Sequence, residues 1–136
     1  MMKFNFLRIV AITAVLPTLC AAQNQTWQWT RIDTAGPAYR FISALTFDEA
    51  RGTAVLFGGV IGRQKEANDT WEWDGQSWQM ENTSGPQARY GHQMAYDARS
   101  KSVLLFGGAN HSGQFFAESW CWDGREWRVV SKKGPT

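Results

Sequence analysis

Short apolar runs, separated by polar or glycine-containing turns, make up most of the chain. The run at 102–106 is apolar after its first residue, a pattern typical of a strand buried on both faces. Side chains of two kinds alternate at 89–97 and at 118–122, and the Asp-Gly pair at 123–124 indicates a tight hairpin. We therefore expect four consecutive strands, at 89–97, 102–106, 118–122 and 126–130.

The same pattern occurs twice, at an offset of 49 residues and without a gap. Trp29, Trp78 and Trp127 fall in register, and so do the Gly-Pro pairs at 36–37, 85–86 and 134–135. A repeat of this length, built from short strands, is typical of propeller blades. The first copy therefore predicts strands at 40–48, 53–57, 69–73 and 77–81, and we expect an all-β fold with no helix after the N-terminal segment.

The blade count is low for a closed ring. The two blades are expected at about 36–84 and 85–133, preceded by a lone outer strand at 26–33, whereas closed propellers typically have 4–8 blades. Two interpretations follow. In the first, the chain is the front of a longer propeller; its end at Thr136, just after a blade-opening Gly-Pro pair, favours this interpretation. In the second, several chains associate to close the ring.

The N-terminal segment has the pattern of a secretory signal peptide. Lys3 and Arg8 flank the start of an apolar run at 9–16, and small residues follow. The run is too short to span a membrane, which takes about 20 apolar residues. We expect cleavage after Ala22, so that residues 1–22 are the signal, residues 23–136 form the partial propeller, and the protein is secreted or periplasmic.

Composition after this cleavage narrows the possible partners. Removing Lys3 and Arg8 leaves 12 basic residues of 14 against 12 acidic ones, so no excess positive charge is available, and we expect no nucleic-acid partner. Cys121 is then the only cysteine, which allows no internal disulfide. Lipid anchoring on Cys20 is the alternative to cleavage, disfavoured by Pro17 and Leu19.

The repeat resembles the kelch motif. An apolar run ends in a double glycine, at 56–59 and 105–108, and is followed at a set distance by Trp71 or Trp120 and then by Trp78 or Trp127. The form Gly-Pro-x-x-Arg, Phe-Gly-Gly, Thr-Trp-x-Trp-Asp-Gly is similar to secreted bacterial kelch proteins, which are often grouped with the central domain of galactose oxidase. The resemblance covers about 26–136 and implies a kelch-type β-propeller.

Cofactor chemistry is not indicated. The copper-radical site of galactose oxidases needs paired tyrosines, histidines and a cysteine crosslinked to one tyrosine, and no such motif can be matched here residue by residue. Cys121 sits between two tryptophans in an outer strand, and the chain has two histidines. We therefore expect no metal and no cofactor.

Positions that recur in both copies are interpreted first as scaffold. Arg40 and Arg89 recur; they either line the channel mouth and bind an acidic ligand, as the resemblance suggests, or are buried arginines paired with a carboxylate or a carbonyl. The tryptophans all fall in outer strands, which favours packing between blades over sugar stacking: Trp27, Trp29, Trp71, Trp73, Trp78, Trp120, Trp122 and Trp127.

Positions that differ are the candidates for function. His92 corresponds to Ser43 but shares a face with apolar side chains, which favours a packed histidine over a site residue. The loops 60–68 and 109–117 have almost nothing in common, and loops on a rigid scaffold are where binding usually resides. Their candidate ligand-binding residues, weighed against an ordinary solvated loop, are Arg63, Lys65, His111, Phe115 and Phe116.

These observations predict an exported kelch-repeat binding module that recognises a protein or a glycan through its loops. No catalytic constellation is visible, so we name no catalytic residue and expect binding rather than catalysis. The alternative is a fragment of a carbohydrate-active enzyme of the kelch type, an oxidase or a sugar epimerase. A fragment with a purely structural role is the third hypothesis, and self-association is expected if the chain is complete.

Overall fold

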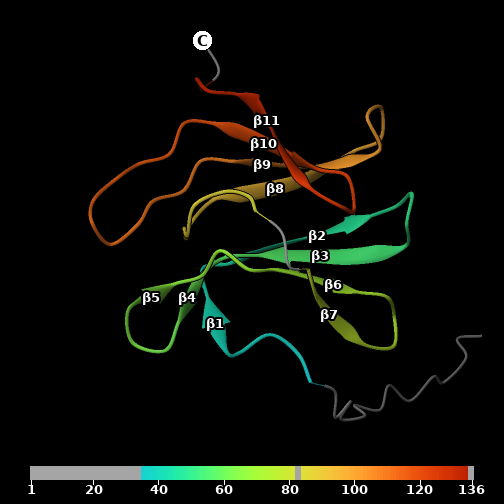
Figure 1. Cartoon of the computed structure of the whole chain (residues 1–136), viewed down its shortest axis with the longest axis horizontal. Helices are drawn as coiled ribbons and strands as arrows, with labels where there is room; N and C mark the ends of the chain where they lie inside the picture. The colour runs from blue at the N-terminus through green and yellow to red at the C-terminus, as the bar shows by residue number, and fades with distance from the viewer. Residues whose placement is uncertain (1–34, 82–83, 135–136) are drawn as a thin grey trace, which may run out of the picture. The chain divides into compact units, whose positions relative to one another are not determined.

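The computed structural model describes residues 35–81 and 84–134 (Figure 1). The predicted signal peptide at 1–22 and the predicted lone strand at 26–33 lie outside these residues. The described part is all-β, with no helix and three antiparallel sheets. The expected fold class is confirmed at this level.

Each sequence copy folds into one four-stranded antiparallel sheet whose strands are adjacent in chain order, apart from the short strands that interrupt the first copy. Tight turns join most neighbours, as the Asp-Gly pairs predict. The first sheet has the order β2 (Ala44–Asp48), β3 (Thr53–Phe57), β6 (Thr70–Trp73) and β7 (Trp78–Glu81). The second has the order β8 (Gln93–Asp97), β9 (Ser102–Phe106), β10 (Ser119–Trp122) and β11 (Trp127–Ser131).

The predicted first strands of both copies are shorter than expected. The strand expected at 40–48 is broken, because Ile42 has a φ of 54° and cannot continue an extended chain. The strand expected at 89–97 begins only at Gln93, and Gly91 has a φ of 66° at the equivalent position. The Gly91 N–H donates to the Ile42 carbonyl at 3.1 Å, so the two breaks contact each other.

A third, smaller sheet arises from the broken strand. Its order is β1 (Arg40–Phe41), β4 (Val60–Ile61) and β5 (Lys65–Glu66), all antiparallel. The segment 60–68, expected to be a variable loop, therefore contains a β-hairpin with Gly62 at positive φ in its turn. Two-residue strands are too short to leave a periodic signal, which is why the pattern missed them.

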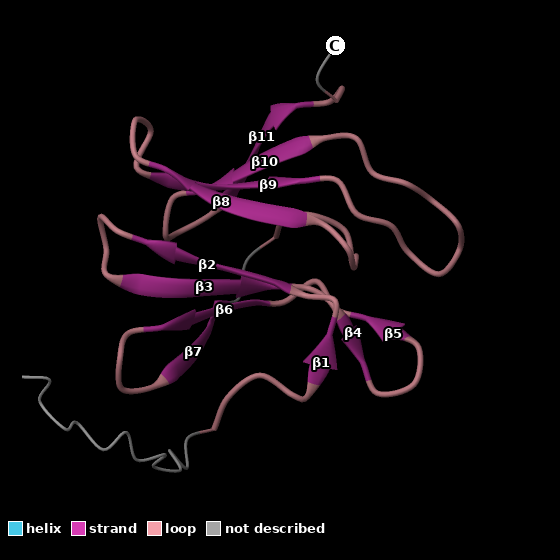
Figure 2. Cartoon of the chain, turned by 180° about the vertical axis from the view of Figure 1, so that it is seen from behind, coloured by secondary structure: helices cyan, strands magenta, loops and turns pink. Residues whose placement is uncertain are grey.

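The hydrophobic core lies between the two large sheets, where one face of each is covered by the other (Figure 2). Its centre joins Val55 and Phe57 of β3 to side chains of β9, β10 and β11, and each buried Val, Leu or Phe contributes roughly 1.5–3 kcal/mol. Phe57 meets Trp127 edge-on, with ring centroids 5.3 Å apart. The buried members from the second sheet are Val103, Leu105, Trp122 and Trp127.

Strand register divides each sheet into two unlike faces. One face of each sheet carries its tryptophans, and we call it the tryptophan face. On the second sheet this face comprises Met94, Tyr96, Val103, Leu105, Trp120, Trp122, Trp127 and Val129. On the first sheet it comprises Leu45, Phe47, Ala54, Leu56, Trp71, Trp73, Trp78 and Met80. We call the opposite face the acceptor face, because on the first sheet it holds the hydrogen-bond acceptors Thr70 and Glu72. On the first sheet it comprises Ala44, Thr46, Val55, Phe57, Thr70 and Glu72. On the second sheet it comprises Gln93, Ala95, Leu104, Phe106, Ser119 and Cys121. In the molecule, the tryptophan face of the second sheet packs on the acceptor face of the first.

Two buried hydrogen bonds fix this packing. The Trp122 indole N–H donates to Glu72 Oε1 at 2.6 Å, and the Trp127 indole N–H donates to Thr70 Oγ1 at 2.9 Å. Glu72 also pairs with Arg51, whose guanidinium reaches it at 2.7 Å. An acceptor is needed at each position because a buried indole N–H without a partner is unfavourable.

Candidate binding site

A double glycine brings the first variable segment against the second repeat. Gly58 and Gly59 both have positive φ, and a Cβ on Gly58 would lie 2.7 Å from the Arg89 carbonyl oxygen. This close approach lets the Gly59 N–H donate to the Arg89 carbonyl at 2.9 Å, while the Arg89 N–H donates to the Ala67 carbonyl at 3.2 Å. The hairpin of β4 and β5 is thereby held to the start of the second copy.

The second variable loop is closed on itself. The Gln114 N–H donates to Asn110 Oδ1 at 3.0 Å, and the Gly113 N–H donates to the Asn110 carbonyl at 3.1 Å. Ala109 forms isolated bridges with Tyr90 on one side and with Phe115 on the other. Both variable loops lie on the same side of the described residues, away from the β2–β3 and β8–β9 turns (Figures 1 and 2).

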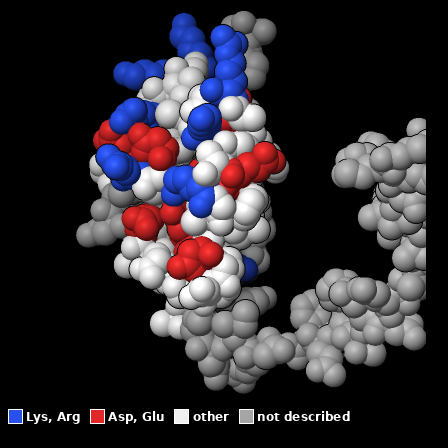
Figure 3. All heavy atoms as spheres, turned by 90° about the vertical axis from the view of Figure 1, so that its right-hand side faces the viewer, with Lys and Arg blue, Asp and Glu red and all other residues white. Residues whose placement is uncertain are grey.

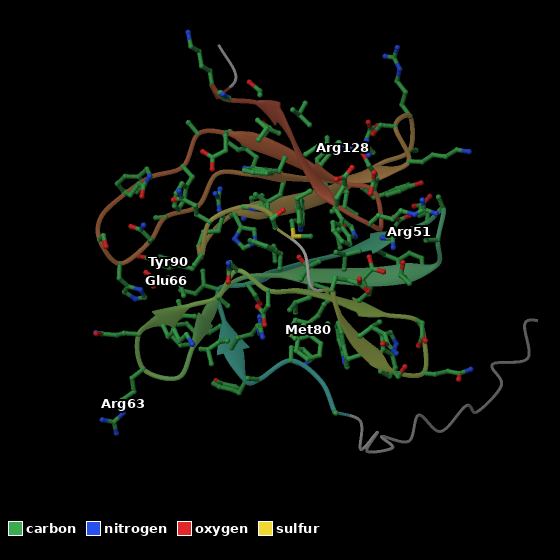
Figure 4. All side chains as sticks on the ribbon, viewed as in Figure 1. Arg51, Arg63, Glu66, Met80, Tyr90 and Arg128 are labelled. Atoms are coloured by element: carbon green, nitrogen blue, oxygen red, sulfur yellow. The ribbon has the colours of Figure 1, made fainter. Side chains whose placement is uncertain are left out.

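A carboxylate–imidazole contact joins the two loops. Glu66 Oε1 lies 2.7 Å from His111 Nδ1, and the same oxygen accepts the His111 backbone N–H. That backbone N–H is the largest cause of the lowered pKa of Glu66. The Tyr90 ring lies beside His111, with centroids 5.0 Å apart, and Figure 4 shows Tyr90 next to Glu66.

The exposed groups around this contact are cationic, aromatic and amide side chains. A pocket of about 200 Å³ lies at the base of the hairpin, lined by Ile61, Lys65, Glu66, Ala67, Asn68 and Asp69. Arg63 projects from the hairpin turn into solvent (Figure 4), and Lys65 forms no salt bridge with another residue in the described part of the chain. Such a surface can pair with an anionic group and stack on a flat apolar one.

Phe115 and Phe116, predicted together as ligand contacts, point in different directions. Phe115 is 85% exposed, whereas Phe116 is 6% exposed. The Arg89 guanidinium carbon lies 3.9 Å from the centroid of the Phe116 ring, a cation–π contact inside the fold. Of this pair, Phe115 alone presents its ring to solvent.

Arg40 and Arg89 occupy equivalent sites in which the protein itself supplies the acceptors. Arg40 binds Asp69 through two nitrogens, at 2.6 and 2.9 Å, and donates to the Gly58 carbonyl at 3.1 Å. Arg89, with 0% exposed side chain, binds Glu118 at 2.6 Å and donates to the Gly107 carbonyl at 2.9 Å. The acceptors of the two arginines are themselves 49 residues apart. This set of contacts, which we call the arginine brace, therefore recurs with the repeat.

These braces act on the carboxylates they bind. Burial raises the pKa of Asp69, but hydrogen bonds from Arg40 and Trp71 outweigh it and hold the pKa below its usual value. Burial likewise raises the pKa of Glu118, and the hydrogen bond from Arg89 is the main opposing cause that lowers it. Both carboxylates are therefore ionised at neutral pH and paired with their arginines.

His92 is buried beneath the loops. It is 2% exposed, and neither ring nitrogen has a hydrogen-bond partner among the described residues. Its ring meets Phe57 edge-on at 5.4 Å between centroids. Burial, and then the charge of Arg89, lowers the pKa of His92 to about 4, so the imidazole is neutral at neutral pH.

Sequence comparison of the two copies pointed to His111, Arg63, Lys65 and Phe115 but missed Glu66 and Tyr90. Glu66 lies inside the variable segment, so its position was available, but nothing in the sequence links it to a histidine 45 residues away. Tyr90 lies in the part of the strand predicted at 89–97 that precedes β8, where it forms only an isolated bridge with Ala109.

The opposite end of the described residues has a mixed surface. Figure 3 shows acidic and basic side chains interspersed there. Arg128 contacts Glu126 at 2.6 Å and Asp123 at 3.1 Å, and Arg51 contacts Asp48 at 2.8 Å. Within 35–81 and 84–134 no three His, Cys, Asp or Glu side chains are grouped as metal ligands, and no helix there is suited to cross a membrane.

No protein-family model matches the chain, and no curated protein is similar enough to count as a match.

Proposed function

We propose that this chain is an exported binding module of the kelch-type β-propeller class, with its ligand held by the loops 60–68 and 109–117. The observation that carries the proposal is the Glu66–His111 contact. It joins the two segments that differ between the repeats into one surface, on a scaffold that both repeats share.

The propeller class is supported by the order and repetition of the sheets. Each 49-residue copy forms a four-stranded antiparallel sheet, and the two sheets stack through unlike faces, as successive blades do. The equivalent braces of Arg40 and Arg89 recur with the repeat. Export is inferred from the N-terminal sequence pattern alone. It is tested by recovering the protein from outside the cytoplasm and measuring its mass, which is expected to lack residues 1–22.

The ligand we favour is a protein or a glycan that carries an anionic group beside a flat apolar surface. Lys65 and Arg63 supply positive charge that no salt bridge to another described residue neutralises, and Phe115 supplies an exposed ring. A cation on a hairpin turn attracts carboxylate or sulfate groups, and an aromatic ring stacks on a sugar or on an apolar side chain.

Binding to an array of neutral and uronic-acid glycans, and to a displayed library of acidic peptides, tests this function. We expect Lys65→Ala and Phe115→Ala each to weaken binding about tenfold, equivalent to about 1.4 kcal/mol. Arg99→Ala, on the β8–β9 turn, is the matched control and leaves affinity unchanged. Equal loss in all three variants would place the ligand elsewhere.

The same samples separate binding from catalysis. Peroxide release and sugar isomerisation are measured on every glycan that binds. Turnover by the purified chain without an added partner would contradict the binding module and favour the carbohydrate-active alternative.

A further inference from the structure

The first sheet carries, on its outer side, a copy of the surface that the second sheet buries. Leu45 and Phe47 occupy the positions of Met94 and Tyr96, which pack against the core. Yet Leu45 is 57% exposed and Phe47 is 54% exposed, and Met80 at the edge of the same face is 58% exposed (Figure 4). Apolar side chains gathered on one face of a sheet mark an association surface.

The second sheet carries the complementary surface on its own outer side. Phe106 stands at the position of Phe57, the ring that receives the edge of Trp127 inside the molecule. Phe57 is fully buried, but Phe106 is 40% exposed. Ser119 stands at the position of Thr70, whose hydroxyl accepts the Trp127 indole N–H. The exposed acceptor face of the second sheet thus offers an aromatic ring and a hydroxyl at the same positions as the buried acceptor face of the first sheet.

We propose that the tryptophan face of one copy of this chain packs on the acceptor face of a second copy. In this contact Trp78 takes the place of Trp127, its ring meets Phe106, and its indole N–H donates to the Ser119 hydroxyl. The occupant is a second copy because the contact inside the molecule specifies the surface that fits. The inference concerns sheet faces and does not depend on the proposed ligand site.

The intermolecular contact lacks the charged part of the internal one. Inside the molecule Glu72 accepts the Trp122 indole N–H and binds Arg51. On the outer acceptor face Cys121 stands at the position of Glu72, and Ser100 stands at the position of Arg51. A thiol is a weak acceptor and carries no charge for this pairing. The association is therefore weaker than the internal packing and depends on concentration.

Two unlike faces make a heterologous contact. After two copies pair, one keeps a free acceptor face and the other keeps a free tryptophan face. Further copies can therefore add head to tail until a ring closes or a chain of copies grows. A symmetric contact of tryptophan face on tryptophan face would instead stop at a dimer. The two arrangements are distinguishable by variants that block one face at a time.

Light scattering on the purified chain over a range of concentrations tests the proposal. We expect a mass at least twice that of one chain at high concentration. Phe47→Glu blocks the tryptophan face and Phe106→Glu blocks the acceptor face, and each variant alone is expected at the mass of one chain. Arg99→Glu places the same carboxylate on the β8–β9 turn, outside both faces, and is expected to associate like the wild type.

Mixing the two blocked variants supplies the sharpest readout. Phe47→Glu retains a free acceptor face and Phe106→Glu retains a free tryptophan face, so the mixture is expected to form a 1:1 pair that cannot extend. Circular dichroism and melting check that each variant is folded, which the exposure of both side chains favours.

Three outcomes would overturn the proposal. The first is a wild-type chain that stays at the mass of one copy at every concentration. The second is a Phe106→Glu variant that pairs with itself, because this indicates a symmetric contact. The third is association that persists in both face variants, because every variant carries the same N-terminal segment and that segment would then be responsible.

Discussion

At two of the positions where both repeats have positive φ, one copy has glycine and the other has a residue with a side chain. Gly91 has a φ of 66° where Ile42 has 54°, and Gly52 has a φ of 69° where Lys101 has 51°. In each pair one copy has glycine and the other has a side chain, which is unfavourable at positive φ and most so when it is β-branched. The copy with glycine therefore indicates what the backbone requires at the other site.

Replacing Ile42 by glycine is expected to stabilise the protein. Ile42→Gly removes the strain of a β-branched residue at positive φ, worth about 1 kcal/mol after the greater entropy of the unfolded chain is subtracted. The side chain is 54% exposed, so little packing is lost. Urea unfolding measures the change. Gly91→Ala, the reverse change at the equivalent site, is expected to destabilise, and a loss of stability in Ile42→Gly would contradict the account of strain.

At the level of elements, the sequence pattern correctly located the strands that lie between two other strands of their sheet. The strands expected at 53–57 and 102–106 are confirmed with the same bounds, because continuous apolar runs between turn residues are a local signal. The hairpin of β4 and β5 and the breaks in the first strands were not predicted. They depend on contacts between segments that lie far apart in the sequence, such as Gly91 with Ile42.

The arginine brace is the other feature at this level. Arg89 connects the segment before β8 to the carbonyl at the end of β9 and to Glu118, which precedes β10. Arg89→Ala is expected to lower the free energy of unfolding by about 2–4 kcal/mol, because it leaves Glu118 and the Gly107 carbonyl without their donor. Thermal and urea unfolding measure the loss, and Arg99→Ala serves as an exposed control.

Arg89→Lys separates charge from geometry, because an ammonium cannot reproduce the planar fork. Its stability is expected to lie between that of the wild type and that of Arg89→Ala. The two alternatives for this arginine, contact with a ligand and support of the fold, predict opposite results. Unchanged melting with reduced ligand affinity would show that the residue serves binding instead of the fold.

At the scale of the whole molecule, stability depends on how the two large sheets meet. Trp122 and Trp127 supply both apolar area and indole donors, and Glu72 and Thr70 accept from them. The same packing encloses Phe57 and covers His92 from water. No described residue forms a hydrogen bond with the ring nitrogens of His92, and burial disfavours the charged imidazole, so the stability of the fold is sensitive to acid.

Stability is expected to fall as the pH decreases from about 6.5 to about 4. The folded pKa of His92 is about 4 and the ordinary value is 6.5, so within this window the unfolded state binds more protons. The contribution of His92 is therefore fully present above the unfolded pKa and is lost toward the folded pKa, with a total of roughly 3 kcal/mol. The lowered pKa values of Asp69 and Glu118 add a further loss of stability as the pH falls through their ordinary values of 3.8 and 4.5, which overlaps the acid end of this window.

The His92→Ser variant isolates this effect. Serine is the residue at the equivalent position 43, so the repeat itself accommodates it. Urea unfolding at a series of pH values is expected to show a smaller slope in the variant than in the wild type between pH 6.5 and 4. Identical slopes would mean that His92 does not titrate in this window. The comparison of slopes is insensitive to any constant loss from the cavity.

The sequence alone determined the repeat, the all-β class, most strands and the two variable segments, because periodicity, glycines and turn residues act over a few neighbouring positions. Tertiary structure decided which of these residues meet. The contact of Glu66 with His111, the burial of His92 and Phe116, and the contrast between covered Phe57 and exposed Phe106 all depend on how two sheets stack. Identical patterns in the two copies lie in different surroundings, since each sheet has one covered face and one outer face in the described residues.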